Sequence, residues 1–259
     1  MSIGLRRLAL LVEYDGTSFA GSQLQSNGPS IQAELERAIE EMTRSFARVA
    51  FAGRTDAGVH ALGQVACFDT QAGYNCEAFV GGLNVRLPDA IAVRSARDVE
   101  QDFDPRRRAI SRRYRYSLVH SMTRVPLQRW RAWQVPSRLD VEQMRAVGRR
   151  LLGEQDFAAF ASPEAGGGST RRRIETVCIR QRGREITVDI EANAFLMHQV
   201  RRTVAALVGV GRGRLRIEAF EQHLREARPG SYERAAPPYG LCLIGVRYEP
   251  PLFAEEREL

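Results

Sequence analysis

The sequence predicts a mixed fold of strands and helices arranged in two related halves. Short apolar runs typical of buried strands alternate with segments whose apolar residues recur at helical spacing. Both halves share a strand–helix–strand order, and no tandem repeat is present. With 259 residues, 44% of them hydrophobic, the chain can form one large domain or two of ordinary size.

The first half alternates strands with helices. The run Leu8–Tyr14 is expected to form a buried strand that ends at the turn residues Asp15-Gly16-Thr17. Ser30 and Asn75 have side chains suited to cap two helices, and Pro88 stops the second. Further short strands are expected at 49–51, 64–68 and 91–93.

A run of charged residues separates the halves. Residues 102–108 read Asp-Phe-Asp-Pro-Arg-Arg-Arg, which is typical of a linker. We therefore expect two subdomains, at residues 1–108 and 109–259.

The second half is expected to begin with a strand at 110–119. Asp140 caps the next helix, with Gln143 in the reciprocal capping-box position, and Gly153 ends it. A hairpin is expected around Arg182-Gly183. Asn193 is expected to start a helix with Leu196, Val200, Val204 and Leu207 on one face, with Arg201 beside that stripe and Arg202 further round. A helix at 217–226 and a strand at 241–248 close the chain.

The charge is strongly positive and comes from arginine alone. The net charge is +7, the isoelectric point is near 9.7, and all 38 basic residues are Arg. The absence of Lys is most simply explained by codon bias. In either case, Arg binds phosphate bidentately and stacks on bases, so the surface suits nucleic acid.

The cysteines and the N-terminus exclude several classes. Four scattered cysteines without C-x-x-C spacing indicate neither a disulfide framework nor a zinc site. The apolar run at 8–12 is too short for a signal peptide, and no run approaches the length of a membrane span. We expect a soluble, cytoplasmic protein with no membrane contact.

One polar, glycine-flanked stretch is the strongest candidate for a site. Residues 52–61 read Ala-Gly-Arg-Thr-Asp-Ala-Gly-Val-His-Ala, with Asp56 two residues after Arg54. Gly53 and Gly58 allow sharp turns and the close approach of a ligand. The structural alternative is a tight turn whose Asp caps its own backbone. His60 is expected to hydrogen-bond within the loop.

Two further segments suit RNA. At 112–116, Arg and Tyr alternate, so one face of a strand presents Tyr114 and Tyr116 and the other presents Arg113 and Arg115. Residues 162–169 are Gly-rich and precede Arg171-Arg172-Arg173, as in a mobile loop that clamps a phosphate backbone. An ordinary amphipathic strand and a solvated turn are the respective alternatives.

Several strings together carry a family resemblance. They are Glu13-Tyr14-Asp15-Gly16, Gly53-Arg54-Thr55-Asp56-Ala57-Gly58-Val59-His60, Arg112-Arg113-Tyr114-Arg115-Tyr116, Leu151-Leu152-Gly153 with Asp156-Phe157, and Asn193-Ala194-Phe195-Leu196 with Val200-Arg201. The chain resembles the TruA-type tRNA pseudouridine synthases over nearly its whole length, and the second string is highly specific.

The resemblance implies fold, substrate and reaction. It implies an α+β pseudouridine synthase fold of two related subdomains, each a mainly antiparallel sheet with helices on one side, and a basic cleft between them. It implies a homodimer that binds tRNA and uses no metal or organic cofactor. The reaction implied is conversion of uridine to pseudouridine at tRNA positions 38, 39 and 40 in the anticodon stem-loop.

Residue roles follow by matching motifs. The family's catalytic carboxylate matches Asp56, and its basic partner matches Arg201. Tyr114 matches the aromatic that packs on the flipped base, and Arg54 matches a residue that helps keep the nucleotide out of the stack. The floor beneath the uracil matches Leu241 or Leu243, of which we take Leu243.

Three departures qualify the match. The family often has Gly-Trp-Gln where this chain has Gly21-Ser22-Gln23, so we expect less RNA stacking there. Asp104 stands where many members have His, although Arg106–Arg108 outweigh its charge. Residues 169–174 align loosely, so no single Arg from the loop 166–173 is assigned.

Two other functions fit parts of the pattern. An RNA-binding module without chemistry would share the charge and the Arg–Tyr strand, but an acidic residue such as Asp56 would weaken its binding. A nucleoside hydrolase would usually need a second carboxylate as general acid. None lies near Asp56 in the sequence.

Overall fold

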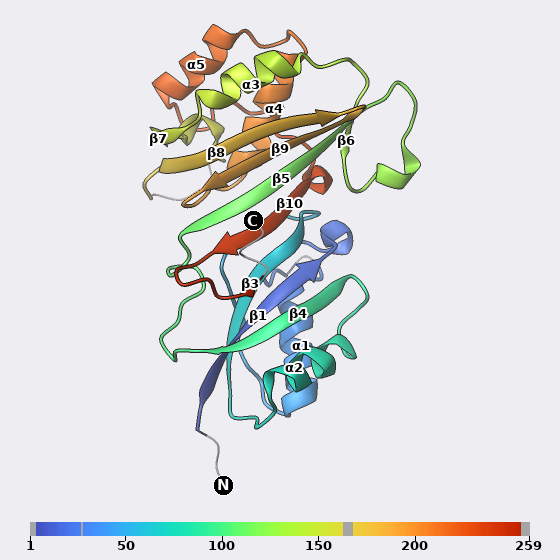
Figure 1. Cartoon of the computed structure of the whole chain (residues 1–259), viewed down its shortest axis with the longest axis vertical. Helices are drawn as coiled ribbons and strands as arrows, with labels where there is room; N and C mark the ends of the chain where they lie inside the picture. Colours follow the sequence, from blue (N-terminus) through green and yellow to red (C-terminus); the bar gives the residue numbers. More distant parts are fainter. Residues whose placement is uncertain (1–3, 27, 163–167, 255–259) are drawn as a thin grey trace. The chain divides into compact units, whose positions relative to one another are not determined.

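The computed structural model describes residues 4–26, 28–162 and 168–254. The chain forms two compact units, one of Met1–Ile110 with Leu243–Leu259 and one of Ser111–Cys242. Each contains a mainly antiparallel sheet and α-helices (Figure 1). The predicted α+β class is confirmed. The predicted subdomain division after residue 108 stays a prediction, as does the basic cleft between subdomains.

The first unit is built on a sheet in the order β4-β1-β3-β10, with β2 paired to β3. Its strands are β1 (Arg6–Tyr14), β2 (Ala50–Phe51), β3 (His60–Thr70), β4 (Ile91–Val99) and β10 (Leu241–Arg247). In the antiparallel register, Leu10 lies opposite Ala66 on β3 and Ala96 on β4. The apolar run predicted the first strand because each of its residues from 8 to 12 is buried.

Two capped helices cover this sheet. Helix α1 (Ile31–Thr43) begins at Ser30, whose hydroxyl accepts a hydrogen bond from Ala33 N–H at 3.2 Å. Asn75 caps α2 (Cys76–Asn84) in the same way, through Ala78 N–H at 2.8 Å. Helix α2 packs on β4, and α1 packs on α2. Both predicted caps are confirmed.

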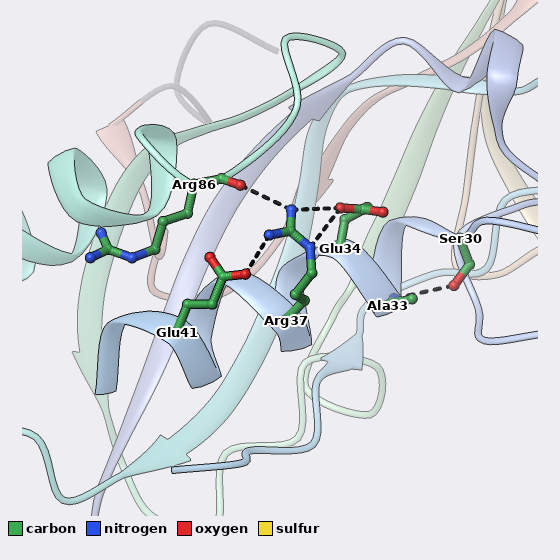
Figure 2. A network of polar contacts seen from close by, with 6 residues as sticks. All are labelled: Ser30, Ala33, Glu34, Arg37, Glu41 and Arg86. Atoms are coloured by element: carbon green, nitrogen blue, oxygen red, sulfur yellow. Dashed lines mark hydrogen bonds and ion pairs between the residues drawn. The ribbon is translucent and has the colours of Figure 1, made fainter. Parts of the chain in front are cut away.

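The exposed side of α1 is tied to the segment that follows α2. Figure 2 shows Arg37 between Glu34 and Glu41, each in contact at 2.8 Å, while its Nη2 donates to the Arg86 carbonyl at 2.9 Å. These partners raise the pKa of Arg37, chiefly through the hydrogen bond to Glu34. Because all three side chains are partly solvated, the ion pairs stabilise the helix only modestly.

The C-terminal segment completes the first unit. The hydroxyl of Tyr248 donates to the Pro105 carbonyl at 2.7 Å, and its ring lies 5.5 Å from that of Phe103. Arg97 donates to the Leu252 carbonyl at 2.9 Å. Residues from both ends of the chain therefore share one core.

The second unit has the sheet order β5-β9-β8-β7, with a short parallel strand β6 on β5. Its strands are β5 (Ser111–His120), β6 (Trp133–Val135), β7 (Gly153–Asp156), β8 (Arg171–Arg182) and β9 (Glu185–Ala192). Its helices are α3 (Val141–Arg149), α4 (Gln199–Gly211) and α5 (Ile217–Glu226). Helix α3 packs on β8 and α4, and α5 contacts α4 and β7.

Several predicted boundaries in the second unit are wrong. Gly153 does not end α3, which stops at Arg149, but opens β7 with a φ of +88°. Helix α4 begins at Gln199 and not at Asn193, because residues 193–198 form an irregular connection that ends in a turn, with His198 at a φ of +62°. The predicted hairpin is confirmed as β8 and β9, with its turn at Gly183-Arg184, since Arg182 still pairs with Glu185.

The capping box at α3 is only half formed. Asp140 accepts hydrogen bonds from Gln143 N–H at 3.0 Å and from Gln143 Nε2 at 2.8 Å. The Asp140 N–H donates instead to the Gly211 carbonyl at 2.8 Å, at the end of α4. The cap therefore also joins α3 to α4. Within the described residues, no helix is both long enough and apolar enough to cross a bilayer.

Candidate active site

The Asp56 loop connects β2 to β3 in the first unit. Both strands pair with each other, so the eight residues 52–59 leave and re-enter the same sheet. The fully buried Gln64 of β3 holds its start. Gln64 Nε2 donates to the Gly53 carbonyl at 2.8 Å, and Gly53 N–H donates to Gln64 Oε1 at 3.3 Å. A side-chain amide thus takes the place of a strand partner.

Thr55 is fixed on three sides. Its N–H donates to Ser22 Oγ at 2.9 Å, and its carbonyl accepts from Ser22 N–H at 3.1 Å. Its hydroxyl lies 2.7 Å from the hydroxyl of Tyr14 on β1. The residue immediately before Asp56 is therefore buried and fully hydrogen-bonded.

Asp56 begins a tight turn. Val59 N–H donates to the Asp56 carbonyl at 3.1 Å, and Gly58 has a φ of +76°, which a type II turn requires at this position. Gly58 N–H donates to the Phe19 carbonyl at 3.3 Å, and Asp56 forms a bridge with Gly21. Asp56 is half-buried and Arg54 is exposed.

Close packing fixes two glycines on the opposite segment, residues 15–22. A Cβ on Gly16 would lie 2.0 Å from the Val59 carbonyl oxygen, so no side chain fits there. Gly21 has a φ of +125°, and a Cβ there would lie 2.9 Å from the Thr55 carbonyl oxygen. The backbone of residues 15–22 therefore packs directly against the Asp56 loop.

His60 joins the loop to the neighbouring segment that contains Gly16, whereas the expected bond within the loop stays a prediction. Its Nδ1 accepts a hydrogen bond from Gly16 N–H at 3.1 Å. Asp15 Oδ1 also lies 3.1 Å from Nδ1, but this oxygen already accepts from Thr17 N–H and Thr17 Oγ1. Because Nδ1 accepts from Gly16 N–H, we place the ring proton on Nε2.

Ser22 agrees with the expectation of less RNA stacking at this position and has a structural role besides. It is fully buried, so it offers no surface to RNA, and its hydroxyl binds the backbone of the Asp56 loop. No local pattern predicts this contact or the one from Gln64, because the bonded residues are 33 and 11 positions apart in the chain.

Tyr114 and Arg201 belong to the second unit. The ring of Tyr114 on β5 is 7% exposed and meets Phe195 edge to face at 5.3 Å. The segment that carries Phe195 is held at both ends. Arg112 Nη1 donates to the Asn193 carbonyl at 2.8 Å, and Leu196 N–H donates to Gln199 Oε1 at 2.8 Å.

Arg201 lies in the first turn of α4. Its Nε donates to the Ala236 carbonyl at 2.9 Å, and Ala236 N–H returns a bond to the Arg201 carbonyl at 3.0 Å. Of the two neighbouring arginines, Arg202 is the more buried, and its Nη1 donates to the Ala161 and Tyr232 carbonyls. The expected orientation of the pair is therefore wrong.

The remaining site residue, Leu243, is fully buried on β10 within the first unit. Asp56, Arg54 and Leu243 thus lie in one unit, and Tyr114 and Arg201 lie in the other. That all five line one cleft stays a prediction.

Much of the Arg–Tyr strand serves the fold. The alternation of faces is as predicted, but Tyr116 is fully buried and its hydroxyl donates to the Pro237 carbonyl at 2.7 Å. Burial raises the pKa of Tyr116 far above its usual value, so the phenol stays a donor. Arg115 is bound to the buried Asp189 at 2.7 Å. For these two residues the structural alternative holds.

The Gly-rich segment lies largely outside the described residues, at 163–167. The arginines after it do not form a loop but open β8, where Arg171 pairs with Glu154 at 3.1 Å. Across the described part of the chain, no three His, Cys, Asp or Glu residues are grouped so that they could hold a metal ion.

Comparison with known proteins decides the family. A family model described as tRNA pseudouridine synthase matches residues 10–106 and 148–249, well over half of the chain. The chain belongs to the tRNA pseudouridine synthase family. The tRNA pseudouridine synthase A of Geobacter sulfurreducens is 43% identical over 246 residues, covering 94% of this chain and 100% of that protein. That of Myxococcus xanthus is 43% identical over 243 residues, covering 93% and 92%.

The predicted TruA-type pseudouridine synthase, an isomerase, is confirmed by these matches. The matched ranges of the synthase family model contain Asp56, Arg54, Arg201 and Leu243 but not Tyr114, which falls between them. Among solved structures, "Crystal Structure of a Cbf5-Nop10-Gar1 Complex" has a TM-score of 0.34 at 10% identity, over 79% of this chain and 54% of that one. That score is too low to add to the family assignment.

Proposed function

We propose that this chain isomerises uridine to pseudouridine at positions 38, 39 and 40 in the anticodon stem-loop of tRNA, with Asp56 as the catalytic residue. The supporting observation is the Asp56 loop. A single half-buried carboxylate stands on a turn whose neighbours on both sides are locked by hydrogen bonds. Such rigidity is what a catalytic group needs and a surface turn does not.

The reaction balances without a redox partner. The N1–C1′ bond breaks, the uracil turns, and C5 bonds to C1′. The C5 hydrogen leaves as a proton and N1 gains one, so no net oxidation occurs. A carboxylate can act as nucleophile or stabilise the detached intermediate, and it can help carry the proton. We propose that the enzyme works with no metal or organic cofactor.

The other residues take supporting roles in this proposal. The target nucleotide leaves the stem stack at a cost of a few kcal/mol. Tyr114 packs on the flipped base, Arg54 keeps it out of the stack, and Leu243 lines the floor beneath it. Arg201 is the basic partner of the Asp56 carboxylate in this proposal. We further propose a cytoplasmic homodimer, as in the family that the chain resembles.

Substrate tRNAs that differ at the three positions test the assignment. Three of these tRNAs each keep a single uridine, at position 38, 39 or 40, and a fourth has no uridine at any of the three positions. After incubation, pseudouridine is mapped by carbodiimide adduct formation and reverse transcription. We expect product at the remaining uridine in each of the first three and none in the fourth. Modification elsewhere in the fourth tRNA, or no product in any, would contradict the proposal.

A further inference from the structure

The connection between β5 and β6 carries an unusual surface. Residues 121–131, here called the β5–β6 arm, contain Arg124, Arg129 and Arg131 and no Asp or Glu. All three arginines are exposed. Three large apolar side chains of the arm are exposed as well, with Leu127 at 99%, Met122 at 79% and Trp130 at 47%. Such a group of exposed apolar residues among charges indicates a binding surface.

The arm is folded and not a loose loop. Val125 and Ala132 are buried with Val119 of β5 in a small apolar cluster. Gln134 Nε2 donates to the carbonyls of Ser121 and Thr123, each at 2.9 Å. Its tip contains the single 3₁₀ turn Pro126–Gln128, the turn between β5 and β6 in Figure 1.

A side-chain contact ties the tip to the sheet. Gln128 Nε2 donates to Glu185 Oε1 at 2.6 Å, at the start of β9. The exposed side chains therefore stand on a backbone that is already ordered. Binding there would cost less conformational entropy than binding to a flexible segment.

An arginine of the arm lies against its exposed aromatic ring. The guanidinium carbon of Arg129 lies 5.6 Å from the centre of the Trp130 ring, and the edge of Tyr239 meets that ring at 5.9 Å. Trp130 still keeps 47% of its surface exposed. Indole faces beside guanidinium groups are what unpaired bases and phosphates bind.

We propose that the β5–β6 arm is an RNA-contacting surface, with Arg124, Arg129 and Arg131 on phosphates and Trp130 stacked on a base. The charge of the arm favours RNA over a protein as its partner. The arm itself contains three arginines and no Asp or Glu, and such a surface fits a polyanion. That the RNA is the tRNA substrate rests on the proposed function. The arm lies outside both ranges matched by the synthase family model, so the family assignment does not supply this role.

The test compares two double variants, each of which loses two positive charges. Arg124→Gln with Arg129→Gln changes the arm. Arg182→Gln with Arg184→Gln removes two exposed arginines from the β8–β9 turn of the same unit. Affinity for tRNA is measured by filter binding at several salt concentrations. For the arm variant we expect affinity to fall by roughly 5- to 50-fold at low salt, and the salt slope to shrink by about 0.7–0.9 per lost phosphate contact.

Trp130 provides an independent check on the arm. Trp130→Ala should weaken tRNA binding by roughly 5- to 100-fold, whereas Trp130→Phe should retain most of it because the stacking face remains. The β8–β9 turn variant should bind as the unmodified protein does. Far-ultraviolet circular dichroism and a thermal melt confirm that each variant is folded.

Two results would overturn the inference. In one, the arm variants and the β8–β9 turn variant have the same tRNA affinity and salt slope. In the other, light scattering shows that the arm variants change oligomeric state while their affinity for tRNA is retained, which would make the arm a protein interface. Binding is measured without turnover. If the protein forms no pseudouridine but the arm variants still weaken tRNA binding as expected, only the proposed function is contradicted.

Discussion

At the scale of single residues, the site depends on contacts between segments that are far apart in the sequence. Thr55 N–H donates to Ser22 Oγ, the Thr55 hydroxyl is hydrogen-bonded to that of Tyr14, and the Gly53 carbonyl accepts from Gln64 Nε2. Gly16 leaves room for the Val59 carbonyl, at a place where a methyl group would lie 2.0 Å from the oxygen. Asp56 is thus held in place through the residues beside it in the loop. Those residues contact four residues from elsewhere in the chain, Tyr14, Gly16, Ser22 and Gln64.

Ser22 tests whether this support matters for catalysis. Ser22→Ala removes the buried acceptor of Thr55 N–H, and we expect the free energy of unfolding to fall by about 1–3 kcal/mol. We expect kcat to fall roughly tenfold because the Asp56 loop is less well placed. The affinity for tRNA should stay unchanged, since Ser22 has no exposed surface.

The measurements are urea unfolding, turnover at saturating tRNA and filter binding. Ser18→Ala, at an exposed serine of the same segment, is the matched control. A Ser22→Ala enzyme with reduced tRNA affinity and normal kcat would show that the residue supports binding and not the catalytic loop.

At the scale of elements, local chemistry predicted where helices begin better than where they end. Ser30, Asn75 and Asp140 each cap their helix, since the cap needs only a side chain and the next three residues. The start of α4 was missed because Arg112, 81 residues away in the chain, binds the Asn193 carbonyl, and a contact over that distance has no local signal. Gly153 suits a helix end and a strand start equally well.

The same limit applies to the candidate site. The Gly53–His60 string located the loop, but the bond from Gly16 N–H that holds His60 comes from outside that string. The expectation that the Arg–Tyr strand suits RNA does not hold for Tyr116 and Arg115. Alternation predicts which face of the strand a side chain takes but not what covers that face. Only the three-dimensional fold shows that Pro237 and Asp189 are their partners.

The cap of α1 gives the element-scale prediction. Ser30→Ala should lower the free energy of unfolding by about 1 kcal/mol, because Ala33 N–H loses its acceptor at the buried end of the helix. Arg37→Ala on the exposed face should cost less, about 0.2–1 kcal/mol. Urea unfolding of both variants measures the difference. A larger loss for Arg37→Ala would mean that its bond to the Arg86 carbonyl, shown in Figure 2, is the stronger tie.

At the scale of the whole molecule, the first unit is made from both ends of the chain. Residues 243–254 contribute β10 beside β3 and bury Val246, Tyr248, Leu252 and Phe253. Each such side chain contributes about 1.5–3 kcal/mol when fully buried. Their sum is comparable to the whole stability of a domain, about 5–15 kcal/mol.

A fragment of residues 1–110 should therefore lack a cooperative unfolding transition. Fusing residues 243–254 to it through a Gly/Ser linker should restore the transition, since Ile110 N–H already bonds the Arg247 carbonyl at 2.8 Å. Circular dichroism during a urea titration is the measurement, with a scrambled 243–254 segment as control. Cooperative unfolding of the fragment alone would show that the C-terminal segment is dispensable.

The central claim, that Asp56 carries the isomerisation, has one direct test. Release of the C5 hydrogen from uridine in an anticodon stem-loop is measured for the unmodified enzyme, Asp56→Asn, and the control Asp89→Asn, which makes the same charge change at an exposed position of the same unit. We predict that Asp56→Asn lowers release by at least roughly a thousandfold while tRNA affinity stays within about threefold. Release near the level of the unmodified enzyme in Asp56→Asn would contradict the account.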